Sequence, residues 1–196
     1  MVLAPGLWMP AAAMGLLAAR LGGRGYAVRV FAYSGRRPYE GNVEALARFA
    51  RDAHLFVGHS LGGVLVLDML NRHAEVEPRA AVLLGAPVRG CFAGRRFGRA
   101  ALGRWMLGEC RALWEAREAR WTRGAPLGVI AGTRPLGLGR MFGALPGASD
   151  GVVCVDETTV EGMRERALVR RGHSMLVVSG QVGDLVDRFL ESGKFA

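Results

Sequence analysis

The feature that most constrains the fold is a glycine-rich turn at residues 58–63, which read Gly-His-Ser-Leu-Gly-Gly. A short apolar run at residues 53–57 precedes the turn and predicts a buried strand. A second apolar run, residues 64–70, follows it and predicts a helix that ends near residues 71–73. The pattern Gly-x-Ser-x-Gly between a strand and a helix is typical of a sharp turn that lifts a serine above a sheet. The glycines supply the small neighbours that such a turn needs, whereas the simpler alternative is a flexible turn with an incidental serine.

Strand-like and helix-like segments alternate along the rest of the chain. We predict further strands at residues 1–4, 26–33, 80–84, 127–131 and 167–170, and helices at residues 10–21, 42–52 and about 178–190. Asn42 is the expected N-cap of the second helix, and a Gly- and Pro-rich irregular loop is expected at residues 134–148. This alternation predicts an α/β fold, with a mostly parallel sheet covered by helices on both faces and a site at the carboxyl ends of the strands.

Length and composition favour one globular domain. The chain has 196 residues, of which 51% are hydrophobic and 22% charged. Its longest apolar stretch, residues 8–19, stops at Arg20, short of the roughly 20 residues that a transmembrane helix needs. The three cysteines, at positions 91, 110 and 154, show no Cys-x-x-Cys spacing. We expect them to be reduced and partly buried, which favours a cytoplasmic location.

Positive charge is concentrated in residues 88–124. The chain has a net charge of +9, and this segment holds nine arginines against three glutamates, or +6 of that charge. It also holds three of the four tryptophans, at positions 105, 114 and 121. Two interpretations remain open: a basic surface that attracts acidic partners, or a solvated helix pair whose tryptophans only pack. Interleaved arginine and tryptophan is weak evidence for nucleic acid, which we do not expect as a partner.

Four short motifs occur in a defined order along the chain: residues 58–62, Gly-Ala-Pro at 85–87 with Gly90 after it, Ser-Asp-Gly-Val-Val at 149–153, and Gly-His-Ser at 172–174. Together they resemble the α/β-hydrolase superfamily, and within it the small bacterial lipase-like serine esterases. The resemblance covers nearly the whole chain. It implies a single α/β-hydrolase domain over residues 1–196, with a short helical cap inserted at approximately residues 88–124.

The resemblance also implies a catalytic triad of Ser60, Asp150 and His173. The acid of the family sits on a loop after a strand, where Asp150 lies, and it would hold the tautomer of the histidine. An alternative is that Asp150 only makes a turn with Gly151, a common pairing. Asp156 is then the reserve candidate for the acid.

The choice of His173 as general base is supported by elimination among the four histidines. His59 adjoins Ser60, so its side chain is expected to point away from the serine hydroxyl. His54 lies at the far end of the predicted strand, and His73 lies where a helix ends. His173 lies on a loop after the last predicted strand, which matches the position of the catalytic histidine in the family.

The loop at residues 5–10 lies where the family places half of its oxyanion hole. The backbone N–H groups of Leu61 and Leu7 are the expected donors, with Trp8 as an alternative to Leu7. Relatives often have His-Gly where this chain has Pro5-Gly6, which leaves the geometry of the loop open but not the donor, because the donor is a backbone group. A simple turn at Pro5-Gly6 is the competing interpretation. For contact with substrate we predict three tryptophans near the site and the cap: Trp8, Trp105 and Trp114. No metal or organic cofactor is expected.

The function predicted from these residues is hydrolysis of carboxylic esters through an acyl-enzyme. A thioesterase or acyltransferase that acts on carrier-bound acyl groups is the main alternative, favoured by the basic segment. A peptide or lactone hydrolase and a non-catalytic binding protein on the same fold are the other readings, and the complete Ser, Asp and His set counts against the last. Expected partners are a small-molecule ester or acyl substrate and, for the basic segment, an acidic carrier protein or an anionic membrane surface.

Overall fold

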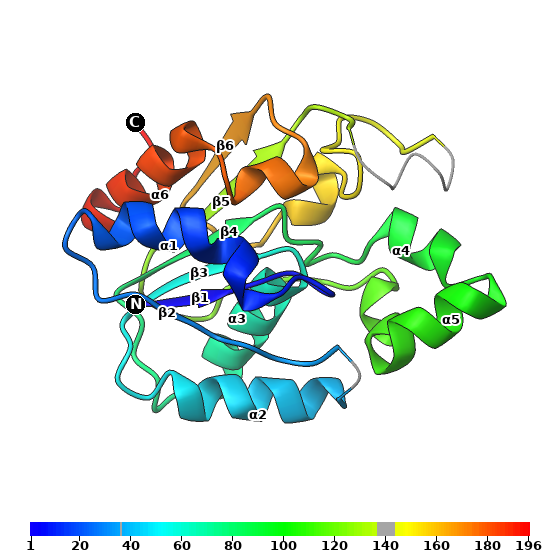
Figure 1. Ribbon diagram of the computed structural model, residues 1–196, viewed down its shortest axis with the longest axis horizontal. Coiled ribbons are helices and arrows are strands. Elements are labelled where there is room, and N and C mark those ends of the chain that lie inside the picture. Colours follow the sequence, from blue (N-terminus) through cyan, green and yellow to red (C-terminus); the bar gives the residue numbers. More distant parts are fainter. Residues whose placement is uncertain (36, 137–143) are drawn as a thin grey trace.

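The computed structural model describes residues 1–35, 37–136 and 144–196, and all of their side chains except those of residues 109 and 111. Its centre is a six-stranded sheet of parallel strands in the order β2-β1-β3-β4-β5-β6 (Figure 1). The strands are β1 (Val2–Ala4), β2 (Arg29–Val30), β3 (Leu55–His59), β4 (Ala80–Leu84), β5 (Leu127–Gly132) and β6 (Glu165–Val169). The predicted parallel α/β sheet is therefore confirmed.

Helices cover both faces of this sheet (Figure 1). On one face, α1 (Gly15–Gly22), which follows the 3-10 helix η1 (Ala11–Met14), packs beside α6 (Gly180–Ser192). On the other, α2 (Tyr39–Phe49) packs against α3 (Leu61–Arg72). Successive residues of a strand face opposite layers, so Phe56 belongs to the core under α2 and α3 while Val57 belongs to the core under α1 and α6. Both strand residues are fully buried, as a parallel sheet between two helical layers requires.

Two local predictions were wrong in detail. Asn42 does not cap α2, because the helix begins at Tyr39 with Pro38 in the N-cap position. The Asn42 side chain is buried within the helix instead, where its Nδ2 donates to the carbonyl oxygen of Ser34. The strand predicted at residues 26–33 is reduced to Arg29–Val30, an edge strand that pairs with β1 alone. Of the loop predicted at residues 134–148, residues 137–143 lie outside the described part of the chain.

Three short helices form a separate group at one side of the molecule: α4 (Phe92–Phe97), α5 (Ala101–Leu107) and the 3-10 helix η2 (Gly108–Trp114), coloured green in Figure 1. Both α4 and α5 pack against η2, and we call this group the cap. The remaining residues of the predicted insertion run back along α3. There, Arg117 pairs with Asp68, and the guanidinium of Arg123 donates to carbonyl groups at the end of α3.

Two further 3-10 helices lie among the described residues: η4 (Val155–Thr158), which follows the loop that carries Asp150, and η5 (His173–Leu176), which begins at His173 itself. All three cysteines are buried thiols. Burial, together with the nearby Glu157 carboxyl, raises the pKa of the Cys91 thiol to about 12, so this thiol stays protonated at neutral pH. Among the described residues, no helix has both the length and the apolar character needed to cross a bilayer.

Candidate active site

The turn between β3 and α3 holds Ser60 in a strained backbone conformation. Its φ of 52° and ψ of −125° lie in a region that side chains other than glycine rarely adopt. The neighbouring glycines make this conformation possible, because a methyl group at Gly58 would collide with the backbone of Gly63. One at Gly62 would collide with the backbone of Ala4 and Pro5, at the end of β1. The sequence therefore builds a tight elbow, residues 58–63, whose serine is presented above the carboxyl ends of the strands.

Ser60, His173 and Asp150 form one continuous chain of hydrogen bonds. The Nε2 of His173 lies 3.0 Å from the Oγ of Ser60, and its Nδ1 lies 2.7 Å from the Oδ2 of Asp150. The other carboxylate oxygen, Oδ1, accepts from the backbone N–H groups of Val152 at 2.9 Å and Val153 at 2.8 Å. Because a carboxylate only accepts, the His173 proton sits on Nδ1, which leaves Nε2 free to accept the proton of the serine hydroxyl.

Asp150 rather than Asp156 occupies the position next to His173. The Asp150 side chain is 1% exposed, whereas Asp156 lies exposed on η4. Two glycines leave room for the buried acid: a methyl group at Gly85 would lie 2.9 Å from the Asp150 Oδ2, and one at Gly132 would lie 2.7 Å from its Cβ. Gly85 begins the Gly-Ala-Pro motif, so that motif serves the packing of the acid and histidine. Its role was not predicted from the sequence.

His59 makes contacts that the sequence did not predict. The Nε2 of its side chain lies 3.1 Å from the main-chain oxygen of His173. The two imidazole rings lie 4.8 Å apart, centre to centre. Complete burial and, to a lesser degree, the nearby His173 lower the pKa of His59 to about 3. His59 is therefore neutral at physiological pH, as a buried ring beside a second histidine should be.

The loop after β1 lies directly against the elbow. A methyl group at Gly6 would lie 3.1 Å from both the Cβ of Ser60 and the Nδ1 of His59, so glycine permits this approach. The loop bends where the N–H of Met9 donates to the carbonyl of Gly6 at 3.2 Å, and Trp8 has a φ of 60°.

Leu61 is the first residue of α3, where a helix leaves its amides without internal partners. Within the described part of the chain, the amides of Leu7 and Leu61 donate to no protein acceptor. Both amides remain available to a ligand. The positive end of the α3 dipole adds to the attraction for negative charge beside Ser60.

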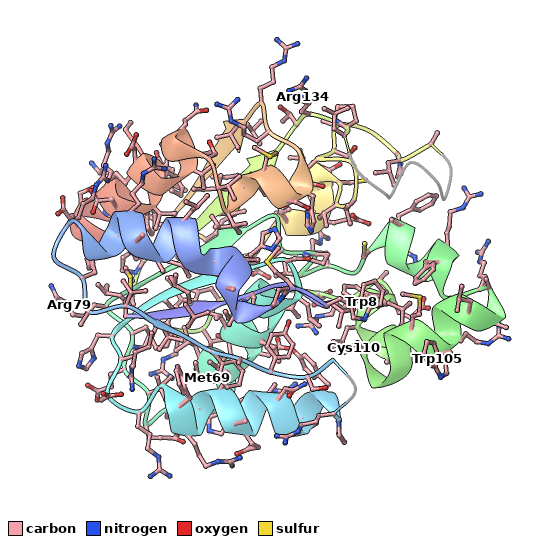
Figure 2. The ribbon with its side chains drawn as sticks, viewed as in Figure 1. Trp8, Met69, Arg79, Trp105, Cys110 and Arg134 are labelled. Carbon is pink, nitrogen blue, oxygen red and sulfur yellow. The ribbon has the colours of Figure 1, made fainter. Side chains whose placement is uncertain are left out.

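A cavity of about 470 Å³ opens between this loop and the cap. Trp8 and Trp105 line it, together with Gly6, Met9, Pro10, Tyr33, Ser34, Gly35 and Met106. Trp8 meets the ring of Phe97 on α4 edge to face, with ring centres 6.1 Å apart, and Figure 2 shows Trp8 on the side of the sheet that faces the cap. Trp114 is instead 5% exposed and packs against Gly94 inside the cap. Two of the three predicted tryptophans thus reach this cavity, and the third packs between cap elements.

Comparisons with known proteins agree with this architecture. The model of the alpha/beta hydrolase family matches residues 1–188. Among solved structures, the mature lipase BlEst2 of Bacillus licheniformis is similar, with a TM-score of 0.71 at 14% identity over 98% of this chain and 91% of that one. A pyrethroid hydrolase from Sphingobium faniae gives a TM-score of 0.62 at 13% identity, over 97% of this chain and 96% of that one. The RedJ thioesterase of the prodiginine biosynthetic pathway in Streptomyces coelicolor gives a TM-score of 0.55 at 20% identity, over 97% of this chain and 83% of that one. No curated protein matches the sequence.

Proposed function

Because the chain belongs to the alpha/beta hydrolase family, we propose that it hydrolyses carboxylic esters through an acyl-enzyme formed on Ser60. The proposal rests on the hydrogen-bonded chain of Asp150, His173 and Ser60. The Nδ1 of His173 lies 2.7 Å from the Oδ2 of Asp150, and its Nε2 lies 3.0 Å from the Oγ of Ser60. A nucleophile within hydrogen-bonding distance of a base, and a base oriented by a third group, is the arrangement that nucleophilic catalysis requires.

In the proposed acylation step, the Ser60 Oγ attacks the carbonyl carbon of the ester while the Nε2 of His173 takes the hydroxyl proton. The carbonyl oxygen becomes an oxyanion, and the amides of Leu61 and Leu7 are its proposed hydrogen-bond donors. The carboxylate of Asp150 stabilises the imidazolium that forms. When the carbon–oxygen bond of the ester breaks, the imidazolium returns its proton to the departing alcohol, and Ser60 carries the acyl group.

In the proposed deacylation step, His173 takes a proton from a water molecule, whose oxygen attacks the acyl carbon. The second tetrahedral intermediate collapses, the imidazolium protonates the Ser60 Oγ, and the carboxylic acid leaves. The cavity beside the elbow, of about 470 Å³, lies within the usual range for small-molecule sites. Its aromatic and methionine side chains suit an apolar acyl or alcohol group of short or medium length.

A thioesterase or acyltransferase on carrier-bound acyl groups is the second candidate. The same nucleophile and base serve a thioester carbonyl, with a thiol as leaving group. The specific observation that favours it is a set of exposed arginines on and beside the cap helices, Arg96, Arg99 and Arg104, which suits an acidic carrier.

Labelling with a fluorophosphonate probe tests the proposed nucleophile directly. We expect the wild-type protein to be labelled on Ser60 and the Ser60→Ala variant to stay unlabelled, although both remain folded. Hydrolysis of p-nitrophenyl esters and of matched acyl thioesters, over a series of acyl lengths, then separates the two candidates by kcat/KM. An unlabelled wild type that hydrolyses neither series, or an alanine variant with wild-type turnover, would overturn the proposal.

A further inference from the structure

We propose that His59 is a positioning residue that holds the main chain of His173 in place for catalysis. The inference rests on the proposed function, because it assigns His59 a part in orienting the proposed base. His59 itself does not contact the reacting atoms. It acts through the peptide carbonyl of His173.

The main chain of His173 is held at both of its polar groups. Its N–H donates to the carbonyl oxygen of Asp150 at 2.9 Å, so the acid loop holds the backbone as well as the ring. Its carbonyl oxygen lies 3.1 Å from the Nε2 of His59. The position of the imidazole relative to Ser60 is therefore set from two directions, one from the acid loop and one from the strand that carries the nucleophile.

The identity of the acceptor defines the tautomer of His59. A peptide carbonyl only accepts, so the bond requires a proton on Nε2 and leaves a lone pair on Nδ1. That Nδ1 is buried and has no hydrogen-bond partner among the described residues. An apolar residue at position 59 would avoid this cost, because a buried polar atom without a partner destabilises a fold. The hydrogen bond from the His59 side chain to His173 accounts for a histidine at this position.

The charge state of His59 suits the same role. During the proposed reaction His173 becomes an imidazolium, and its ring centre lies 4.8 Å from that of His59. A second positive charge at this distance would disfavour the imidazolium and slow proton transfer. Complete burial keeps the pKa of His59 far below neutrality, so the ring donates its hydrogen bond without adding charge.

Three substitutions at one position separate the hydrogen bond from packing. His59→Gln places an amide N–H near the position of the imidazole Nε2, and its charge does not change with pH. His59→Asn places the amide near the position of Nδ1, because its side chain is one methylene shorter than that of glutamine, so the amide does not reach the main-chain oxygen of His173. His59→Leu removes the donor. We expect the Asn and Leu variants to lose about 10- to 100-fold in kcat, with KM nearly unchanged, since small misplacements of catalytic groups have effects of this size. We expect the Gln variant to stay within a few-fold of wild type.

The matched control is His54→Leu, at the other end of β3. His54 also bonds a main-chain carbonyl, that of Glu77, at 2.9 Å, but it is exposed and distant from the elbow. Its substitution should leave kcat unchanged. A second readout is the proton NMR signal of the His173 Nδ1–H, which should shift or broaden in the Asn and Leu variants and stay in place in the Gln variant.

Equal kcat in all three variants and the wild type would overturn the inference. A Gln variant as slow as the Leu variant would also overturn it, because the ring rather than the donor would then matter. If the Leu variant does not fold, the comparison of Gln with Asn decides. Failure of the proposed function is distinguishable from these results, because it appears in the wild type as an absence of labelling and of hydrolysis.

Discussion

At the scale of single residues, two aspartates are candidates for the acid that orients His173: Asp150 and Asp156. The Oδ2 of Asp150 bonds the His173 Nδ1 at 2.7 Å, whereas Asp156 is exposed on η4. We expect Asp150→Asn to lower kcat by about 10⁴, because an amide in place of the carboxylate favours the wrong tautomer of the histidine. Asp156→Asn, the matched control, should retain full activity in an ester hydrolysis assay. The reverse pattern would make Asp156 the acid.

A second residue-scale prediction concerns stability at mildly acidic pH. The pKa of His59 is lowered from 6.5 to about 3 by burial, with a smaller contribution from His173. Between these two values the unfolded chain binds a proton at this site and the folded chain does not. Acidification through this window therefore favours unfolding, and stability is recovered as the pH rises. From pH 7 to pH 5, the titration of His59 should lower the free energy of unfolding by about 2 kcal/mol.

The measurement is urea unfolding of the wild type and of His59→Gln at both pH values. Glutamine does not titrate, so the variant should lose about 2 kcal/mol less than the wild type on acidification. Other groups titrate in this range in both proteins, and the difference between the two removes their contribution. Parallel stability curves for the two proteins would show that His59 takes up a proton within the folded state.

At the scale of elements, one buried carboxylate joins three segments. Asp68 on α3 accepts from the Tyr39 Oη on α2 at 2.7 Å, and from both terminal nitrogens of Arg117, after the cap, at 3.2 Å and 2.5 Å. Its side chain is 8% exposed and that of Arg117 27% exposed. This bidentate pair connects the segment after the cap to the helices beneath the sheet.

We expect Asp68→Asn to destabilise the protein by about 3 kcal/mol, because it leaves the largely buried guanidinium of Arg117 without its charge partner. The matched control is Glu161→Gln, which breaks the exposed pair of Glu161 with Arg120 and should change stability little. Thermal and urea unfolding measure both variants. An Asp68→Asn variant as stable as the control would mean that the buried pair contributes no more than an exposed one.

At the scale of the whole molecule, charge is distributed unevenly between the cap and the rest of the surface. Arg96, Arg99 and Arg104 are exposed on or beside the cap helices, and two other cap residues, Trp105 and Met106, line the cavity. Arg117 and Arg123 of the same segment are less exposed, because Arg117 bonds Asp68 and Arg123 bonds the end of α3. We therefore expect only the exposed cap arginines to attract an acidic carrier protein, which we favour over an anionic membrane surface as their partner.

This attraction should depend on salt and on the type of substrate. Raising the ionic strength from 0.1 M to 1 M shortens the screening length from about 10 Å to about 3 Å. We expect kcat/KM for a carrier-bound acyl thioester to fall over this range, and kcat/KM for a small neutral ester to stay constant. Replacing Arg96, Arg99 and Arg104 together by Gln should remove most of the salt dependence.

The matched control removes three exposed arginines far from the cap: Arg48, Arg51 and Arg79. Figure 2 shows Arg79 at the side of the molecule opposite to the cap. This control has the same net charge as the cap variant and should retain the salt dependence. The same salt dependence for both substrates would leave the cap arginines as ordinary solvated surface. Salt-dependent retention on anionic phosphatidylserine vesicles, but not on carrier protein, would favour the membrane instead.

The sequence by itself determined the alternation of strands and helices, and with it the helix-covered parallel sheet. It also determined the place of the elbow. Apolar runs and glycines around Ser60 are local signals, because the sterics of a tight turn and the period of a strand or helix act over a few residues. The same locality explains the errors at β2 and at the start of α2, since propensity does not report whether an edge strand has neighbours or whether Asn42 finds a partner in Ser34.

Only the tertiary structure decided which side chains meet. The bond between His173 and His59 joins residues 114 positions apart, and the choice of Asp150 over Asp156 depends on space left by Gly85 and Gly132. The sequence does not distinguish Trp114 from Trp105, yet Trp114 packs inside the cap and Trp105 lines the cavity. Such contacts depend on how a whole sheet and its helices close around one another. No local pattern of residues encodes that closure.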